Sequence, residues 1–405
     1  MVEIEFSYIR DHALDRDTWT TFLDEFCSKH GVKVHLREEL SWDTAWAELF
    51  SYTSNGKAPH VSHIGNTWIN SLARLDVLRP FKPEEIAAIG GGWDFVAPNW
   101  DAGMLSGDKK VWGIPWTAWI YVICYRKELL APAGIDAAGA FGTIQAAAQT
   151  IASLADSGLE IPWLNSQLPV AARDFLHTAA SWIWGAGGDL TYRDGTRVLF
   201  NSPAALEGLK YWLDTYRAVS KPYKKLNPAE MVDVFREGRA AAILTSIRGA
   251  NTFTGEQCEA VVRENLGVAP VTDVPWTGGG SFVIWQHIQY NPQQEQAAVE
   301  LVKFLASKDI NLRYQRETNC LPSRIDALKE IYPEGNPARE AVMLAATRGR
   351  HYYNTATWRR IELQLSDELG KVLRETLDSP APDTEAILHA HLDPLAAQLN
   401  RTLNV

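Results

Sequence analysis

The sequence has only four cysteines in 405 residues, and their spacing excludes the common cysteine sites. Cys27, Cys124, Cys258 and Cys320 are separated by long, unrelated intervals, and no CxxC pair occurs among them. Zinc sites and thiol redox sites depend on such pairs. We therefore expect buried free thiols, and one disulfide stays open as an alternative if the compartment is oxidising.

Long apolar runs are also missing from the chain. A helix that spans a membrane needs about 18 to 20 consecutive apolar residues. The longest candidate here, the run WIYVIC at 119–124, is short enough to be one buried strand. No segment is therefore expected to cross a bilayer.

The start of the sequence lacks the pattern of a leader. The first ten residues, MVEIEFSYIR, show a strand-like alternation directly after Met1, without a basic, apolar and small-residue leader. Two interpretations stay open from the residues alone. Either the protein is cytosolic, or a leader has been removed and Met1 marks an artificial start.

Positive charge is in deficit. The chain has 39 Lys and Arg against 49 Asp and Glu, which gives a formal net charge of −10. Binding to a phosphate backbone needs clustered basic residues that release counterions. Nucleic acid is therefore not expected as a partner.

Sequence motifs for catalysis and cofactor binding are missing as well. The glycine-rich stretches GAGGD and TGGGS, at 185–189 and 277–281, lack both the P-loop pattern and the dinucleotide fingerprint. The ten histidines form no HExxH pair, and no GxSxG nucleophile elbow occurs. We predict a protein that is not an enzyme and holds neither a cofactor nor a metal. A glycosidase, which needs only two suitably spaced carboxylates, stays open as an alternative.

The length and the order of the patterns indicate two α/β lobes. A chain of 405 residues exceeds the size at which one hydrophobic core usually stops growing. Strand patterns at 2–9, 32–39 and 59–65 alternate with helix patterns at 15–31 and 42–56, and this order favours a largely parallel sheet. Longer helices and no polar linker follow, so we expect short, structured crossings that act as a hinge.

Tryptophan is present in excess, with sixteen in the chain. Nine lie at predicted strand ends, turns or loops: Trp42, Trp46, Trp68, Trp93, Trp100, Trp116, Trp119, Trp276 and Trp358. An indole face stacks on the apolar face of a sugar ring while its N–H donates to a hydroxyl group, and strand-end loops are where α/β folds bind ligands. Carbohydrate is therefore the leading ligand class. Core packing is the alternative for any one of them, and it is favoured for Trp19, Trp163, Trp182, Trp184 and Trp212.

Several longer segments together resemble a known protein family. They include APHVSHIGNTWINSLARLDVLRPF at 58–81, VWGIPWTAWIYVICYRKELLAPAGI at 111–135 and GGDLTYRDGTRVLFNSPAALEGLKYWLD at 187–214. Further matching segments lie at 231–249, 266–273, 278–307 and 319–324. In their order and spacing they resemble the solute-binding proteins of bacterial ABC importers, in particular the sugar-binding group that includes the maltodextrin-binding proteins.

That resemblance implies a two-lobed periplasmic binding protein fold of type II, with three crossings and a ligand cleft between the lobes. The N-terminal lobe would hold 1–115 and 271–318, and the C-terminal lobe would hold 116–270 and 319–405. It further implies a monomer in the periplasm or outside the cell, with or without a lipid anchor. Such a protein captures a carbohydrate by lobe closure and delivers it to the permease subunits of an ABC transporter.

The resemblance also nominates ligand-binding residues. They are Arg10, Asp11, Glu39, Trp42, Asn66, Thr67, Trp68, Trp116, Trp119, Ser246, Arg248, Gly279, Ser281, Tyr352, Asn354 and Trp358. Aromatic planes suit the faces of sugar rings, and charged side chains suit vicinal hydroxyl groups. Tyr352, Asn354 and Trp358 are expected on the second lobe, opposite Trp68.

Two departures from the family pattern leave the particular ligand open. The acidic residues typical of maltodextrin binding are not clearly reproduced, and the segment GGGWDFVAPNW at 90–100 has no counterpart. An oligosaccharide or glycoside is the leading prediction. A charged small solute, such as a glycerol phosphodiester or a polyamine, is the alternative within the same fold.

Overall fold

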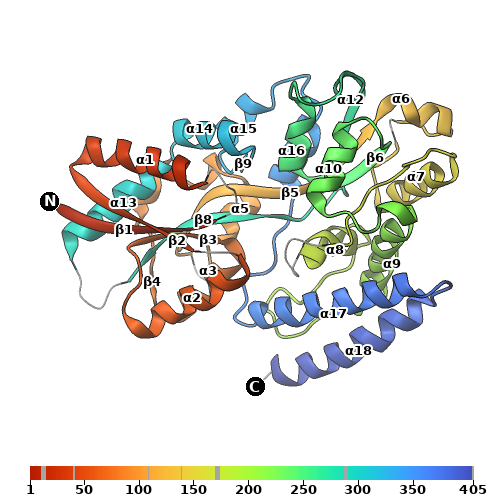
Figure 1. Cartoon of the computed structure of the whole chain (residues 1–405). Coiled ribbons are helices and arrows are strands. Elements are labelled where there is room, and N and C mark those ends of the chain that lie inside the picture. The colour runs from red at the N-terminus through yellow and green to blue at the C-terminus, as the bar shows by residue number, and fades with distance from the viewer. Residues whose placement is uncertain are drawn as a thin grey trace. The chain divides into compact units, whose positions relative to one another are not determined.

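The computed structural model divides the chain into two compact units (Figure 1). The structure describes residues 1–10, 15–39, 42–107, 109–137, 139–168, 174–286 and 291–403. Unit 1 consists of Met1–Trp119, Thr277–Ile331 and His351–Arg359; unit 2 consists of Ile120–Trp276, Tyr332–Arg350 and Arg360–Val405. The first segment of unit 1 ends at Trp119 where the expected boundary was 115, and the second runs from Thr277 to Ile331 where 271–318 was expected. The third segment lies within the lobe expected for 319–405.

A mixed sheet forms the centre of unit 1. Its strands follow the order β2 (Val32–Glu39), β1 (Val2–Ile9), β3 (Val61–Gly65) and β8 (Thr277–Trp285). Strands β2 and β3 both pair parallel to β1, as the alternation of patterns predicts, whereas β8 pairs antiparallel to β3. The short strand β4 (Leu78–Arg79) extends the sheet on β8, and β9 (Leu321–Pro322) pairs with β5 (Ile114–Arg126).

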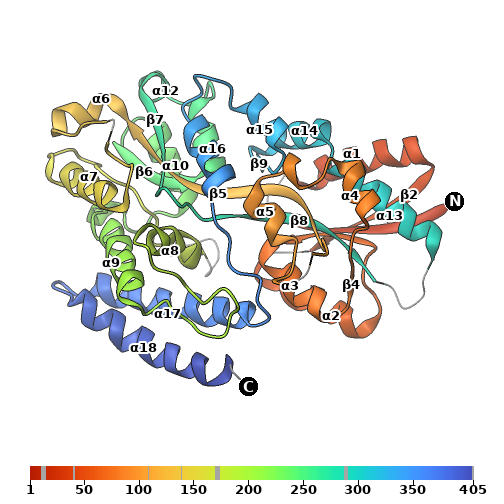
Figure 2. The same cartoon turned by 180° about the vertical axis from the view of Figure 1, so that it is seen from behind.

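Helices cover both faces of this sheet (Figures 1 and 2). The helices of unit 1 are α1 (Asp15–His30), α2 (Trp42–Asn55), α3 (Asn66–Arg74), α4 (Pro83–Ile89), α5 (Ala97–Ala102), α13 (Pro292–Leu305), α14 (Lys308–Thr318) and α15 (Ile325–Ile331), with a short 3-10 helix η1 (Gly92–Asp94). Side chains of α1 and α13 pack on one face, and side chains of α2 and α3 pack on the other. Two separate hydrophobic clusters result, one on each side of the sheet.

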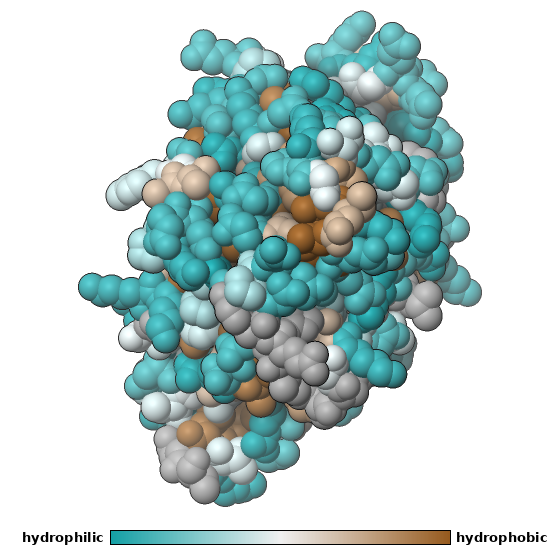
Figure 3. Space-filling view, turned by 90° about the vertical axis from the view of Figure 1, so that its left-hand side faces the viewer, coloured by the Kyte–Doolittle hydropathy of each residue, from teal (hydrophilic) through white to brown (hydrophobic). Residues whose placement is uncertain are grey.

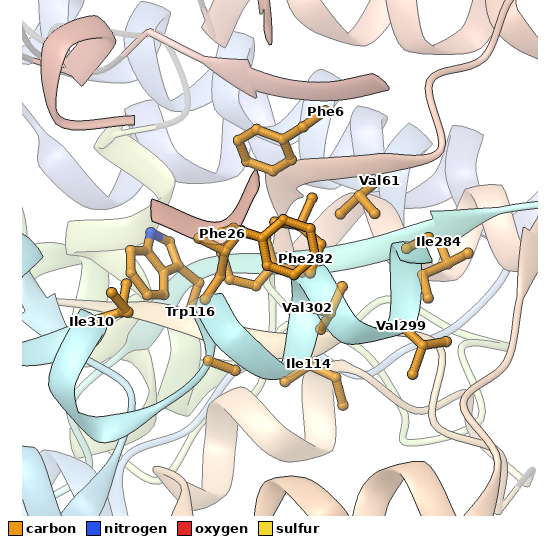
Figure 4. Close-up of a cluster of buried hydrophobic side chains, with 14 of the residues drawn as sticks. Phe6, Phe26, Val61, Ile114, Trp116, Phe282, Ile284, Val299, Val302 and Ile310 are labelled. Atoms are coloured by element: carbon orange, nitrogen blue, oxygen red, sulfur yellow. The ribbon is translucent and has the colours of Figure 1, made fainter. Parts of the chain in front are cut away.

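The larger cluster shows why α1 forms where the sequence predicts it (Figure 4). Trp19, Phe22 and Phe26 recur at helical spacing, and all three are fully buried. In Figure 4 the ring of Phe26 lies beside Phe282 of β8 and close to Val302 of α13. Burying one such side chain contributes about 1.5 to 3 kcal/mol, so this stripe of α1 fixes the helix on the sheet.

Unit 2 is built on the far half of β5. Strands β6 (Ala242–Ser246) and β7 (Leu266–Pro270) both pair antiparallel to β5 beyond Ile120. The helices are α6 (Lys127–Leu130), α7 (Ile144–Asp156), α8 (Asp174–Gly185), α9 (Pro203–Arg217), α10 (Pro228–Arg236), α11 (Ile247–Asn251), α12 (Ala260–Asn265), α16 (Arg339–Arg348), α17 (Trp358–Asp378) and α18 (Thr384–Leu403). The first two residues of α17, Trp358 and Arg359, belong to unit 1. The short 3-10 helices are η2 (Ala131–Ala133), η3 (Lys221–Tyr223) and η4 (Thr252–Thr254).

The packing of α8 on α9 explains the tryptophans of this region. A Cβ atom at Gly208 of α9 would lie 2.4 Å from the carbonyl oxygen of Trp182, so the glycine allows the two helices to approach closely. Trp212 Nε1 donates to Thr178 Oγ1 at 3.1 Å across the same interface. Trp182 and Trp212 are fully buried, in agreement with the packing role that their helical positions favour.

The surface and the cysteines agree with an ordinary folded chain. Figure 3 shows a mostly hydrophilic face on the side that carries the N-terminus, with hydrophobic residues gathered in a few small areas. Cys124, Cys258 and Cys320 are buried free thiols as expected, whereas Cys27 is a free thiol that is partly exposed. Within the described ranges, no helix is both long enough and apolar enough to span a membrane.

Candidate functional site

The carboxyl ends of β1, β2 and β3 meet at one edge of the unit 1 sheet, because these strands are parallel. Arg10 follows β1, is exposed, and lies 3.3 Å from the carboxylate of Glu38. Tyr8 donates a 2.6 Å hydrogen bond to Glu38 Oε2, and this bond is the main reason why the pKa of Glu38 is lowered. Asp11 and the side chain of Glu39, both nominated from the sequence, lie outside the described residues.

A group of three tryptophans lies next to this edge. The ring centroid of Trp68 is 5.6 Å from that of Trp42 and 5.7 Å from that of Trp46. Trp68 is fully buried, while Trp42 and Trp46 remain partly exposed. The guanidinium carbon of Arg359 lies 5.1 Å from the Trp46 ring centroid and 5.9 Å from that of Trp68. Trp42, Trp46, Trp68 and Arg359 are called the tryptophan cluster below.

The segment that supplies Arg359 is anchored on unit 1 rather than on unit 2. Asn354 Nδ2 donates to the carbonyl oxygens of Asp101 and Met104, at 2.9 and 2.6 Å. Asn70 of α3 donates to the carbonyl oxygen of Thr355. The structure therefore differs from the expectation that this segment belongs to the second lobe, because these side-chain hydrogen bonds tie it to α3 and α5.

Two further nominated residues of this segment pack against each other. The rings of Tyr352 and Trp358 are stacked, with centroids 4.1 Å apart and planes 21° apart. Both side chains are buried. The structure thus brings Trp358, Asn354 and Trp68 into one unit, with the indoles of Trp68 and Trp358 held in its interior.

The first crossing strand, β5, places its tryptophans differently from one another. Trp116 is fully buried in the larger cluster of unit 1, where its ring centroid lies 4.9 Å from Tyr314 and 5.1 Å from Phe282 (Figure 4). Trp119, three residues later, is partly exposed. Of these two nominated residues, only Trp119 is partly exposed.

Polar groups at the start of β8 meet the end of β3. Ser281 Oγ lies 2.7 Å from Asn66 Oδ1, and both side chains are buried. The Nδ2 group of Asn66 has no hydrogen-bond partner in the described part of the chain. Thr67 is partly exposed, and Gly279 has a φ of +145°, a conformation that favours glycine.

His63 is a buried group in unit 1 that the sequence did not single out as a ligand residue. Its ring centroid lies 6.2 Å from those of Trp19 and Trp42 and 6.1 Å from that of Phe282. Neither ring nitrogen has a hydrogen-bond partner among the residues that the structure covers. Burial lowers the pKa of His63 to about 4, so the imidazole is neutral at physiological pH. Its place in a strand of apolar pattern gave no signal for this environment.

In unit 2, the nominated residues lie at the end of β6. Ser246 Oγ accepts a hydrogen bond from Gly249 N at 3.3 Å and so caps the short helix α11. Ser246 and Arg248 are both partly exposed. The register places Tyr121 of β5 opposite Ser246, and the Tyr121 ring lies 6.1 Å from that of Trp276.

A second set of aromatic and charged groups in unit 2 was not nominated from the sequence. Trp276 stacks on His177 with ring centroids 4.0 Å apart. The guanidinium of Arg350 lies 4.6 Å from the ring centroid of Trp184 and forms a 2.9 Å ion pair with Asp189. Trp184 Nε1 also donates to Asp189 at 3.1 Å. Asp189 lies in the GAGGD stretch, whose glycines could have indicated a special environment.

The described residues contain no group of three His, Cys, Asp or Glu side chains that could hold a metal ion. The partly exposed groups described above include indole rings, guanidinium groups and a hydroxyl group, together with the carboxylates of Glu38 and Asp189, each of which is paired with an arginine. These groups bind neutral polar ligands by stacking and hydrogen bonding.

Comparison with known proteins gives the same fold. A family model described as bacterial extracellular solute-binding protein matches residues 21–341. No curated protein sequence matches the chain. The sugar-binding protein MalE from Xanthomonas citri is similar in structure, with a TM-score of 0.79, 19% identity, and coverage of 99% of this chain and 98% of that chain.

Two further solved structures are similar over essentially their whole length. An ABC transporter solute-binding protein from Thermotoga lettingae, bound with α-D-tagatose, has a TM-score of 0.76 and 17% identity and covers 100% of both chains. The cyclic α-maltosyl-1,6-maltose binding protein from Arthrobacter globiformis has a TM-score of 0.74 and 17% identity, with 100% of this chain and 99% of that chain covered. These likenesses confirm the expected two-lobed α/β fold class.

Proposed function

This chain belongs to the bacterial extracellular solute-binding proteins, and from that premise we propose that it captures a carbohydrate and delivers it to the permease of an ABC importer. The membership agrees with the resemblance seen in the sequence. The three similar structures named above are described as sugar-binding proteins or as a complex with a sugar, and they support carbohydrate as the ligand class.

The tryptophan cluster is the observation that carries the proposal. Trp42 and Trp46 are partly exposed, and the buried Trp68 and the Arg359 guanidinium hold their neighbourhood in place. A partly exposed indole offers a flat apolar face to the C–H groups of a sugar ring, while guanidinium N–H groups suit its hydroxyl groups. More than one such ring favours an oligosaccharide or a glycoside.

The proposed mechanism is capture by closure. A ligand shifts the population toward a closed form only if it binds that form more tightly, so it has to contact residues of both units. Trp42 of unit 1 and Ser246 and Arg248 of unit 2 are proposed as contacts, together with Trp119, the last residue of unit 1 before the chain enters unit 2. A dissociation constant of about 1 μM corresponds to about −8 kcal/mol, which a few stacked rings and charge-assisted hydrogen bonds can supply.

We further propose that the protein acts as a monomer in the periplasm or outside the cell, and that it does not turn over its ligand. The partly exposed groups described above stack and hydrogen-bond. The family and the similar structures are solute-binding proteins, which supports this part of the proposal. The permease subunits would receive the closed form.

Thermal melting and intrinsic tryptophan fluorescence against a panel of solutes test this function. The panel contains maltose, D-tagatose and longer oligosaccharides, with glycerol phosphodiesters and polyamines as charged controls. A ligand at 100 times its dissociation constant stabilises the folded state by about 2.7 kcal/mol and so raises the melting temperature. A response to charged controls alone would support the charged-solute alternative, and release of sugar products would support the enzyme alternative.

Matched variants show where a sugar binds. Trp42→Ala and Trp119→Ala are expected to abolish the response to the sugar, because both rings are partly exposed at the proposed contacts. Trp93→Ala is the control, since the Trp93 side chain is 97% exposed within the same unit as Trp42. Trp68 is less suitable, because removing a fully buried indole destabilises the fold itself.

A further inference from the structure

The segment 90–102, most of which has no counterpart in the family pattern, makes a series of contacts inside unit 1. It contains η1 and α5, and we call it the brace segment. Its backbone joins the chain that follows β9: Val96 N donates to the carbonyl oxygen of Ser323 at 2.8 Å, and Phe95 and Arg324 form an isolated antiparallel bridge. The guanidinium of Arg324 adds a 3.2 Å ion pair with Asp94.

Asn99 of the brace segment joins two strands that connect the units. Its Nδ2 group donates to the carbonyl oxygen of Thr117 at 3.0 Å and to that of Gly278 at 2.9 Å. Thr117 belongs to β5 and Gly278 to β8. The chain leaves unit 1 after Trp119 and returns to it at Thr277, so both acceptors lie within two residues of these points.

The burial of Asn99 makes this a specific arrangement. Its side chain is fully buried, and its two amide hydrogens are each taken by one carbonyl oxygen. Asn99 Oδ1 has no hydrogen-bond partner within the described ranges. A buried polar atom without a partner lowers the stability of the folded protein. An apolar side chain at this position would avoid that loss, so the two donated hydrogen bonds have to offset it.

Gly279 allows the two strands to approach this closely. A Cβ atom at this position would lie 2.0 Å from the Thr117 carbonyl oxygen and 2.7 Å from Asn99 Nδ2. Its φ of +145° is also one that other residues rarely adopt. The spacing of β5 and β8 therefore depends on the absence of a side chain at Gly279 and on the amide of Asn99.

Strand β9 also pairs with β5 at this point. Strand β9 pairs with β5 at Thr117 and Ala118, and Ser323 N donates to the carbonyl oxygen of Trp116 at 3.2 Å. The brace segment thus contacts β5 and β8 through Asn99, and reaches the residues after β9 through Val96.

We infer that residues 90–102 hold the connecting strands together at the boundary of unit 1, with Asn99 as the positioning residue. Bending between the units is then confined to residues beyond Thr117 and Gly278, because the strands are fixed to each other up to these carbonyls. The consequence for ligand capture rests on the proposed function. A hinge that is fixed on one side loses less conformational entropy when the protein closes on its ligand.

Hydrogen exchange of the ligand-free, full-length protein tests the brace. In Asn99→Ala, peptides from β5 and β8 are expected to exchange about tenfold faster than in the wild type, with peptides from β2 as the internal reference; a tenfold change corresponds to about 1.4 kcal/mol. Asn311→Ala is the matched control, because Asn311 is also a buried asparagine of unit 1, and among the described residues it donates only to Leu305 O, at 3.5 Å. Equal exchange of β5 and β8 in the two variants would overturn the inference.

A binding measurement separates the brace from the proposed function. With maltose or D-tagatose, whichever raises the wild-type melting temperature more, Asn99→Ala is expected to weaken binding at least about tenfold. Asn311→Ala is expected to bind as the wild type does, and equal affinities in all three proteins would overturn the role in capture. Failure of the wild type to bind any sugar would tell against the proposed function, while the exchange result still decides the brace. Should Asn99→Ala not fold, Asn99→Ser, which keeps one donor, serves both measurements.

Discussion

Trp276 lies face to face on His177, with ring centroids 4.0 Å apart and ring planes 14° apart. The pair joins helix α8 to Trp276, the last residue of unit 2 before the chain enters β8. The backbone N–H of Trp276 also donates a 2.9 Å hydrogen bond to Ser181 Oγ of α8. The residue next to a unit boundary is thus fixed to a helix by a ring stack and a backbone hydrogen bond.

The stack predicts a graded response at His177. His177→Ala should destabilise the protein by about 2 kcal/mol, because it removes both buried area and an aromatic pair worth about 0.5 to 1.5 kcal/mol. His177→Phe keeps a ring over Trp276 and should cost clearly less. Urea unfolding followed by circular dichroism measures both variants, and equal losses would show that the stack itself contributes nothing.

Arg324 is predicted to need its guanidinium shape. Its N–H groups reach the carbonyl oxygen of Ile89 at 3.0 Å, Asp326 at 3.0 Å and Asp94 at 3.2 Å, and its side chain is only 9% exposed. A lysine has the charge but not the fork, so Arg324→Lys should cost about 2 kcal/mol in the free energy of unfolding. Arg316→Lys, at an exposed ion pair with Glu330, should stay within about 0.5 kcal/mol.

His391 is predicted to make the joint of α17 and α18 sensitive to alkali. Its ring nitrogens lie 2.6 Å from Glu368 and 2.8 Å from Glu375, while Lys371 pairs with Glu368. Burial opposes the charged imidazole, but the hydrogen bonds with Glu375 and Glu368 raise the pKa of His391 above its ordinary value. A raised pKa means that the stabilisation is complete below about pH 6.5 and is lost as the pH rises through the pKa of the folded protein.

The measurement compares melting temperatures of the wild type and His391→Gln from pH 5 to pH 9. The wild type should be more stable by about 1 kcal/mol at pH 5.5, and the difference should shrink toward pH 9. His389→Gln, at the exposed pair with Asp393, is the control on the same helix. A difference that does not vary with pH would contradict the assignment.

His63 is predicted to act in the opposite direction. Since burial lowers its pKa to about 4, the unfolded chain takes up a proton below about pH 6.5 while the folded protein does not. Its contribution to stability therefore falls between about pH 6.5 and pH 4, by about 2 kcal/mol at pH 5. His63→Leu should remove this loss while staying close to the wild type at pH 7. Ring resonances of His63 that titrate above pH 6 would refute the prediction.

The thiols are predicted to differ in accessibility. Burial raises the pKa of Cys124 and of Cys258, and Cys320 is also buried, whereas Cys27 is partly exposed. A thiol reagent at pH 8 should label Cys27 in the native protein and all four cysteines after unfolding. Cys27→Ser should then abolish labelling of the native protein. Fewer than four reactive thiols in the unfolded, unreduced chain would instead indicate a disulfide.

The sequence by itself determined the local elements and the family. The predicted strands 2–9 and 32–39 are β1 and β2, and the predicted helix at 15–31 is α1. This helix ends at His30, directly before Gly31, which has a φ of +65°. These features follow from hydrophobic periodicity and from turn residues, which act over a few neighbouring positions. The family followed from segments whose order and spacing can be read along the chain.

Only the tertiary structure decided which side chains are exposed and which unit holds them. Trp68, Trp116 and Trp358 were nominated as ligand contacts, yet all three are buried, while Trp42 and Trp119 remain partly exposed. The exposure of an indole depends on what covers it: Trp116 is packed against Tyr314 and Phe282, which come from a different part of the sequence. The sequence around Asn99 likewise gives no sign of its role, because its partners Thr117 and Gly278 lie on β5 and β8. Contacts between residues far apart in sequence leave no periodic pattern in either partner, so the fold alone assigns them.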